Sequence, residues 1–142
     1  MKKGDIFGLV ILLVMIGLMA CFFIFAPESN NVQNQARVDG SVIENITVHN
    51  GHTVTLTVTA MTASFVTLHE TISTAPGPII AVSPRINAGE HLDIDLGVAG
   101  GLQKGSSYIV LMVKDDGDGV YEPGIDLPIV SGDSVVKELF TL

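Results

Sequence analysis

The sequence has little charge, a single cysteine and no tryptophan. One cysteine among 142 residues cannot form an internal disulfide, which excludes a disulfide framework and a cysteine-based zinc site. Charged residues make up 15% of the chain, against roughly 25% in a typical soluble domain. Seven basic residues stand against 15 acidic ones, so no basic surface is available to neutralise nucleic-acid phosphates. The composition excludes nucleic acid as a partner, and a mean hydropathy of +0.50 indicates that part of the chain is built for lipid.

What the chain does contain is one long hydrophobic run. Ile6 to Ala26 are 21 consecutive residues without a charge, amide or hydroxyl. A helix of this length measures about 31 Å, which matches the roughly 30 Å hydrocarbon core of a bilayer. Lys2 and Lys3 precede the run and Glu28 follows it, so the lysine bias places residues 1–5 in the cytoplasm. We therefore expect a single-pass membrane protein with a transmembrane helix over residues 6–26, in contact with lipid, and an extracytoplasmic C-terminal domain.

Three fates compete for this segment. An uncleaved signal-anchor is favoured, because the run exceeds the 7 to 15 residues of a typical cleavable signal. A lipobox at Leu18 to Cys21 is disfavoured, because the chain stays apolar through Phe25 instead of becoming polar. Residues 3–6, followed by the apolar run, resemble the archaeal class III signal peptide of type IV pilin-like proteins. That resemblance implies cleavage between Gly4 and Asp5 and a retained helix that bundles into a filament core.

Beyond the hydrophobic run, the pattern changes twice. Residues 27–40 are polar and rich in Asn and Gln, which is typical of a tether that cannot bury enough surface to order itself. Residues 41–142 then show a hydrophobic period of two, clearest in Thr53 to Ala60, where Val and Leu alternate with Thr. We expect an all-β domain, an immunoglobulin-like β-sandwich of about seven strands. The predicted strands cover residues 42–48, 53–60, 64–70, 78–83, 91–96, 108–113 and 134–142.

Turn signals separate these strands. Asn50 and Gly51 tolerate positive φ and predict a tight hairpin between the first two strands. Gly and Pro clusters predict further turns at residues 75–78, 88–89 and 97–101. Tyr108 to Val113 is apolar on both faces, which indicates a central strand. The paired cysteines and tryptophan of antibody domains are absent, so membership of the antibody type is not supported.

The strongest local signal is the acidic stretch from Lys114 to Asp126. Its clustered carboxylates repel one another unless they are hydrated or neutralised, and calcium neutralises such groups through oxygen ligands. The match to the calcium-loop pattern is degenerate, because Lys114 stands at the first ligand position and Ile125 at the twelfth. A calcium site and a solvated acidic turn between two strands are therefore both open. The candidate calcium ligands are Asp115, Asp116, Asp118, Glu122 and Asp126.

No pattern in the sequence indicates an enzyme. His69 and Glu70 begin a zinc-protease pattern, but Ser73 stands where the second histidine is needed. His91 lies on the polar face of its predicted strand, where a surface histidine is the ordinary case. A nucleophile elbow, a phosphate loop and a dinucleotide fingerprint are all absent. We expect no catalytic residues.

Asn45, Ile46 and Thr47 form an N-glycosylation sequon in a domain expected outside the cell. Strand alternation places Val42, Ile46 and Val48 inward. Asn45 is therefore expected to point outward, and the sequence makes it a candidate glycosylation site.

A longer pattern extends over roughly residues 53–142. It consists of Phe65 to Glu70, Gly77, Ile80, Val82, Ser83, Ala88 to His91, Val110 to Met112, Asp115 to Gly119, Tyr121, Asp126, Pro128, Gly132 and Val135. The order of these residues resembles a domain family of unknown function found in archaeal surface and secreted proteins. Members often carry a histidine before the acidic loop and an aromatic residue after the proline, where this chain has Val113 and Ile129. The resemblance implies an archaeal envelope location and a β-sandwich, and it implies no reaction.

Taken together, the features predict a membrane-anchored archaeal cell-envelope protein. Its sandwich is expected to act in binding or structural assembly, and not in catalysis. An envelope protein, a neighbouring copy or a cation would use exposed strand edges and the acidic loop. The alternative is a type IV pilin-like filament subunit cleaved after Gly4.

Overall fold

The computed structural model describes Ala36–Arg37 and residues 40–142. These residues form strands, turns and loops. The predicted transmembrane helix over residues 6–26 and the predicted cleavage after Gly4 lie outside the described residues. Among the residues that the structure describes, no helix is long and apolar enough to cross a membrane.

The strands in chain order are β1 (Ala36–Arg37), β2 (Val42–His49), β3 (Thr53–Ala60), β4 (Ser64–Ile72), β5 (Ala75–Val82), β6 (Gly89–Gly97), β7 (Ser107–Lys114), β8 (Leu127–Ser131), β9 (Ser134–Val135) and β10 (Lys137–Thr141).

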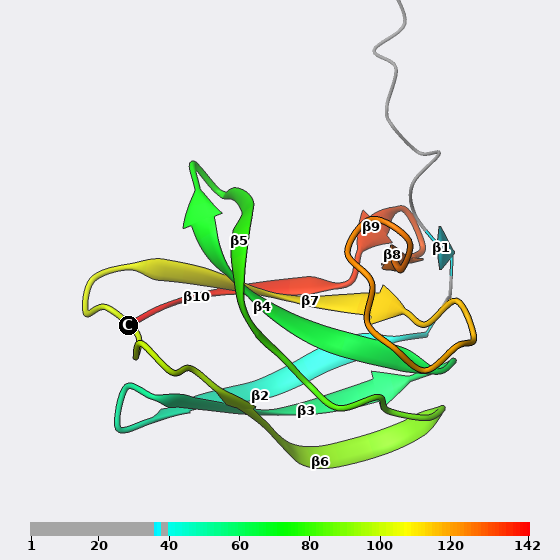
Figure 1. The fold of residues 1–142 in the computed structure, drawn as a ribbon, viewed down its shortest axis with the longest axis horizontal. Coiled ribbons are helices and arrows are strands. Elements are labelled where there is room, and N and C mark those ends of the chain that lie inside the picture. The colour runs from blue at the N-terminus through cyan, green and yellow to red at the C-terminus, as the bar shows by residue number, and fades with distance from the viewer. Residues whose placement is uncertain (1–35, 38–39) are drawn as a thin grey trace, which may run out of the picture. The chain divides into compact units, whose positions relative to one another are not determined.

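The strands build two sheets (Figure 1). The larger sheet has the order β1-β8-β7-β4-β5. β10 pairs with β7 along residues 107–111, and β8 pairs with β7 at Val113 and Lys114. β2, β3 and β6 form the smaller, antiparallel sheet. The described region is therefore all-β with two sheets, which is consistent with the predicted β-sandwich. β1 comes from the segment predicted as a tether, and it pairs in parallel with β8.

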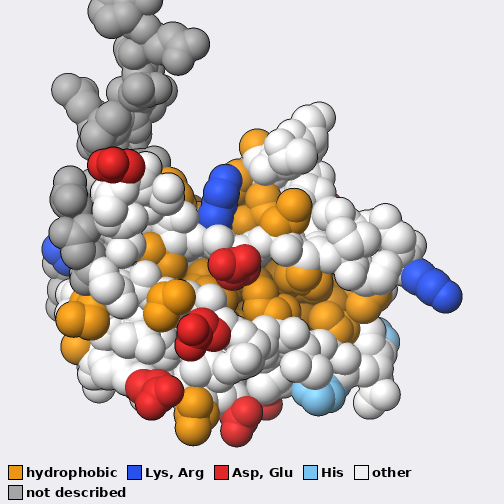
Figure 2. Space-filling view, turned by 180° about the vertical axis from the view of Figure 1, so that it is seen from behind, with side chains coloured by type: hydrophobic (Ala, Val, Ile, Leu, Met, Phe, Trp, Pro, Cys, Tyr) orange, Lys and Arg blue, Asp and Glu red, His pale blue; other side chains and the backbone are white. Residues whose placement is uncertain are grey.

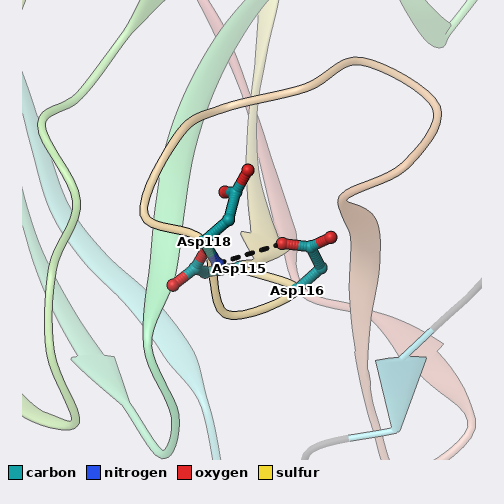
Figure 3. A group of neighbouring side chains, drawn as sticks. All are labelled: Asp115, Asp116 and Asp118. Carbon is teal, nitrogen blue, oxygen red and sulfur yellow. Dashed lines mark hydrogen bonds between the residues drawn. The ribbon is translucent and has the colours of Figure 1, made fainter.

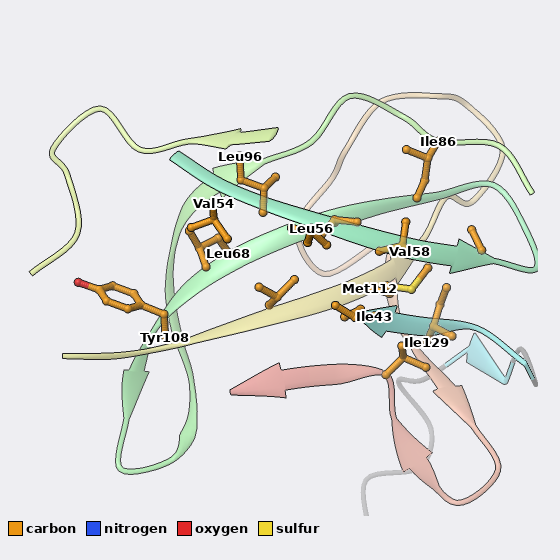
Figure 4. Close-up of a cluster of buried hydrophobic side chains, with 14 of the residues drawn as sticks. Ile43, Val54, Leu56, Val58, Leu68, Ile86, Leu96, Tyr108, Met112 and Ile129 are labelled. Atoms are coloured by element: carbon orange, nitrogen blue, oxygen red, sulfur yellow. The ribbon is translucent and has the colours of Figure 1, made fainter. Parts of the chain in front are cut away.

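The hydrophobic core lies between the two sheets (Figure 4). Alternate residues of each strand point into this space, because side chains of a strand alternate between its faces. Burying these apolar side chains supplies most of the stabilisation, at roughly 25 cal/mol per Å² removed from water. The central contributors are Val54, Leu56 and Val58 from β3, Val66 and Leu68 from β4, and Val110 and Met112 from β7.

β7 is buried on both of its faces. Its other set of alternate residues, Ile109, Leu111 and Val113, is also buried, as is Phe65 of the neighbouring strand β4. Tyr121 packs against Phe65 with ring centroids 5.6 Å apart in an edge-on arrangement. The prediction of a central strand over residues 108–113 is confirmed, since β7 has partners on both sides.

The two edge strands β2 and β10 lie next to each other on one side of the domain. Side chains from both sides are partly buried against the core: Ile46 and Val48 from β2, Phe140 from β10, and Leu142, which follows β10. Tyr108 stacks on Phe140 at 5.6 Å and closes the core there. Figure 2 shows the molecule from behind, where hydrophobic side chains gather at the centre of the face and acidic side chains lie beside them.

The structure corrects two sequence predictions, one in β2 and one in β5. Val42 was expected to point inward, but it is 38% exposed and Ile43 is buried at 4%. A β-bulge in β2 adds one residue, so the inward-facing positions are Ile43 and then Ile46 instead of every second residue.

Residues 75–78 were expected to form a turn, but they belong to β5, and the turn lies at Ser73 and Thr74, both with positive φ. The hairpin turn predicted at Asn50 and Gly51 is confirmed by φ values of 51° and 67°.

Candidate functional site

The acidic loop covers residues 115–126 and connects β7 to β8. The sequence prediction of an acidic segment between two strands is thus confirmed, although β8 itself was not predicted. Asp115, Asp116 and Asp118 come together at the start of this loop (Figure 3). One oxygen atom of each carboxylate lies within 4.8 Å of the others. Asp115 is buried, while Asp116 and Asp118 are exposed.

Asp115 has a cationic partner from a distant part of the chain. The Nε atom of Arg85 donates a hydrogen bond to its Oδ2 atom at 2.6 Å. The backbone N–H groups of Gly117 and Gly119 donate to its Oδ1 atom at 3.2 and 3.0 Å. The Arg85 hydrogen bond and these N–H groups stabilise the charged carboxylate and hold the pKa of Asp115 below its ordinary value of 3.8, against the opposing effect of burial.

Asp116 and Asp118 shape the exposed turn of the loop. The Oδ1 atom of Asp116 accepts a hydrogen bond from the N–H of Asp118 at 3.2 Å, the bond that Figure 3 marks. The Oδ1 atom of Asp118 accepts one from the N–H of Val120 at 2.8 Å. A carboxylate that bonds to the backbone two residues later stabilises a turn by itself. These bonds account for aspartates at both positions without a bound ion.

Asp126 fastens the two ends of the loop to each other. Its Oδ1 atom accepts from the N–H of Asp116 at 3.0 Å, and its Oδ2 atom accepts from the N–H of Glu122 at 2.8 Å. The carboxyl group is almost fully buried. The carboxylate charge also acts on Tyr121, whose pKa is raised above 10.0 by burial and by the negative charge of Asp126. Asp126 therefore has a structural role that requires both of its oxygen atoms.

The fit of this loop to calcium is incomplete. Three of the five predicted ligands gather, and their carboxylate oxygens are of the kind that calcium prefers. However, Asp115 already pairs with Arg85, and within the described residues Glu122 and Asp126 do not join the group. Calcium binding stays a prediction from the sequence. Sequence reasoning missed Arg85; its only signal was that it is the single arginine of residues 41–142.

The sequence also places the chain in a family. Residues 40–141 match the domain of unknown function DUF7282, which is well over half of the chain. The chain belongs to the DUF7282 family. No curated protein and no solved structure matches the chain. The assignment agrees with the expected family of unknown function, and it specifies neither a reaction nor a ligand for the DUF7282 domain.

The histidines of the DUF7282 domain do not form a metal site in the described part of the chain. His69 is buried, and its two ring nitrogens lie 2.8 Å from Thr67 Oγ1 and 2.9 Å from the carbonyl oxygen of Gly77. Because a carbonyl only accepts, Nδ1 donates to Gly77, and this bond joins β4 to the irregular strand β5. His91 is bonded through Nε2 to the carbonyl oxygen of Asn87 at 2.7 Å.

A polar pocket of about 270 Å³ lies at the opposite end of β7 from the acidic loop. Tyr108 accepts a hydrogen bond on its hydroxyl from the N–H of Gln103 at 2.6 Å, and Thr71 donates to the carbonyl oxygen of Ser107 at 2.9 Å. These four groups of the pocket wall are therefore already hydrogen-bonded to one another in pairs. The pocket is lined by Glu70, Thr71, Gln103, Ser106, Ser107 and Tyr108.

Within the part of the chain that the structure describes, the outer strands β2, β5, β6 and β10 are irregular or charged. β2 and β6, the outer strands of the smaller sheet, each contain a bulge with a residue at positive φ, Asn45 at 53° and Asp93 at 54°. β5 contains two register shifts as well as Pro76 and Pro78, which cannot donate to a further strand. The exposed strand β10 begins with a lysine and a glutamate. Such features hinder the addition of another strand.

Proposed function

We propose that the protein is a membrane-anchored archaeal cell-envelope protein that displays its DUF7282 domain outside the cell. The observation that carries the proposal is the uncharged run of residues 6–26, long enough to span a bilayer, ahead of a domain built from strands. The lysines before the run support a cytoplasmic N-terminus. The anchor leaves residues 41–142 as the working part of the protein.

The proposal includes an immunoglobulin-like topology for the domain. In an immunoglobulin sandwich, strands A, B and E form one sheet and strands C, F and G the other. The order β2-β3-β6 corresponds to A, B and E, and β5-β4-β7-β10 corresponds to C′, C, F and G. The chain crosses between the sheets from β3 to β4, from β5 to β6 and from β6 to β7, as this scheme requires.

The proposed role is binding or structural assembly without catalysis. Within the described residues, Thr67 and His69 form a hydroxyl–imidazole pair at 2.8 Å, the kind of pair that a hydrolase uses. Both side chains are buried, and the other imidazole nitrogen is occupied by the carbonyl of Gly77. A substrate cannot reach this pair without opening the sheet. The irregular strand edges further favour contacts through a face of the domain over addition of a strand.

A type IV pilin-like subunit is the second candidate, and the sequence from Lys3 to Ile6 favours it. Both candidates share the extracytoplasmic domain, and they differ in the fate of the N-terminus. Mass spectrometry of the mature protein separates them: an intact N-terminus supports the anchor, and a chain that begins at Asp5 supports the pilin-like subunit.

The location is tested by protease treatment of intact cells that express the full-length protein with a C-terminal epitope tag. We expect the tag to be digested without lysis and the protein to remain in the membrane fraction after alkaline extraction. Ile16→Arg places a charge in the middle of the run, which costs about 2.5–3.5 kcal/mol of insertion free energy and should release the protein from the membrane. Gln33→Arg adds the same charge after the run and is the control. A tag that resists protease in intact cells contradicts the proposal.

A further inference from the structure

Asn45 begins the only N-x-S/T triplet of the chain, and the structure presents this triplet to solvent. Asn45 and Thr47 are both exposed, while Ile46 between them is partly buried against the core. Among the side-chain hydrogen bonds of the described residues, none involves the carboxamide of Asn45. The acceptor nitrogen of the sequon is therefore accessible and unbonded.

The bulge in β2 produces this presentation. Glu44 pairs with Thr57 and Thr47 with Thr55, so Asn45 and Ile46 together oppose the single residue Leu56. Asn45 takes the left-handed conformation at φ 53°, which asparagine tolerates better than most residues. The extra residue lets Ile46 reach the core and leaves Asn45 and its carboxamide outside the regular ladder.

The place of Asn45 on β2 also bears on how the edge of the smaller sheet is protected. β2 is an outer strand of the smaller sheet and pairs with β3 on one side. No strand of the described residues pairs with its other edge, which is its free edge, although β10 of the larger sheet lies near β2. The outer strands β5, β6 and β10 carry prolines, several acidic residues or a lysine, whereas β2 has Glu44 as its one acidic residue and no lysine or proline. A bulky, hydrated group at Asn45 would cover the edge that has least protection of its own.

We propose that Asn45 is an N-glycosylation site whose glycan shields the free edge of β2. This inference rests on the proposed function, because the modification requires the domain to be outside the cytoplasm. The donor is a polyprenyl-phosphate-linked oligosaccharide. The Nδ2 atom of Asn45 bonds to the anomeric carbon, the bond between that carbon and the phosphate oxygen breaks, the lipid phosphate leaves with the electron pair, and the nitrogen releases one proton.

The test is mass spectrometry of the full-length protein isolated from membranes of its own source organism. Trypsin cuts after Arg37 and Arg85, so one peptide contains the sequon. We expect this peptide to carry an added mass of at least one monosaccharide, with fragments that localise it to Asn45. Asn45→Asp removes the acceptor nitrogen but keeps a residue that tolerates positive φ, and Thr47→Ala removes the hydroxyl at an exposed position. Both variants should lose the added mass.

Thr47→Ser preserves the sequon and is the matched control, which should keep the modification. A bare peptide in the wild-type protein overturns the proposal, as does an added mass that persists in Asn45→Asp, because the peptide also contains many serines and threonines. The protease test of intact cells is read separately. A digested tag with a bare Asn45 refutes the glycan alone, whereas a protected tag refutes the extracytoplasmic location.

Discussion

Asp126 offers the sharpest test of how the acidic loop is held. Its buried carboxylate accepts one N–H from Asp116 and one from Glu122, and so joins the two ends of a loop that separates β7 from β8. Replacement by alanine removes both acceptors. A hydrogen bond to a charged group contributes about 1.5–3 kcal/mol net. Both bonds are only partly buried, so the freed N–H groups can regain some water. We expect Asp126→Ala to lower the free energy of unfolding by about 2–4 kcal/mol.

Asparagine at the same position should give an intermediate result. Its carbonyl oxygen can keep one of the two bonds, but its NH₂ group then faces the other N–H donor. We expect Asp126→Asn to lose about half as much free energy as Asp126→Ala, with the same fold.

The measurement is chemical and thermal unfolding of the detergent-solubilised full-length protein. A loss of 2–4 kcal/mol corresponds to a Tm lower by about 10–20 °C for a domain of this size. Near-ultraviolet circular dichroism should report the loosening of Tyr121 from Phe65, since the chain has only two tyrosines. Asp133→Ala, an exposed aspartate in the β8–β9 turn, is the control and should change stability by less than about 0.5 kcal/mol. Equal stability of Asp126→Ala and Asp133→Ala would refute the assigned role.

Four further results are expected. The pKa of Asp115 in the folded protein lies below 3.8, so its ionised carboxylate stabilises the fold above pH 3.8, and this stabilisation is lost as the pH falls through the folded pKa. Arg85→Gln removes the main cause of the lowered pKa and should make the free energy of unfolding less dependent on pH in this acid range. Gly77→Ala places a Cβ atom 2.9 Å from the carbonyl oxygen of Glu70 and 2.9 Å from Cγ1 of Ile72, and should lower the free energy of unfolding in urea by about 1–3 kcal/mol. An unchanged free energy of unfolding would contradict this close approach of β5 to β4. Leu68→Ala empties a fully buried position and should cost about 2–5 kcal/mol, whereas Leu92→Ala, 66% exposed, is its control at less than about 0.5 kcal/mol. If the acidic loop binds calcium as the sequence predicts, calcium at a hundred times its Kd adds about 2.7 kcal/mol to the free energy of unfolding and raises the Tm. Magnesium is the comparison, and an unchanged Tm at millimolar calcium would refute the site.

The acidic loop also illustrates how a local pattern can admit two explanations. Clustered aspartates with glycines are what a calcium loop needs, and they are equally what a tight turn needs when carboxylates bond to nearby N–H groups. Which explanation applies depends on the partners of Asp115 and Asp126. One partner is Arg85, 30 residues away in the sequence, and nothing in the loop itself signals it.

Local sequence patterns determined the all-β class, most strand positions and the Asn50–Gly51 hairpin. Alternation in Thr53 to Ala60 and the unbroken apolar stretch of β7 depend only on which face of a strand each side chain occupies, and that is a property of neighbouring residues. The family resemblance and the acidic loop were likewise visible in the order of residues.

Tertiary structure alone decided the features that arise between strands. The bulges at Asn45 and Asp93 exist because two residues of an edge strand face one residue of β3, and pairing of this kind cannot be read from either strand by itself. The same holds for the placement of residues 75–78 in β5 and for the pairing of Arg85 with Asp115. Register and ion pairing join segments far apart in the chain, so they are fixed only when the two sheets close over their common core.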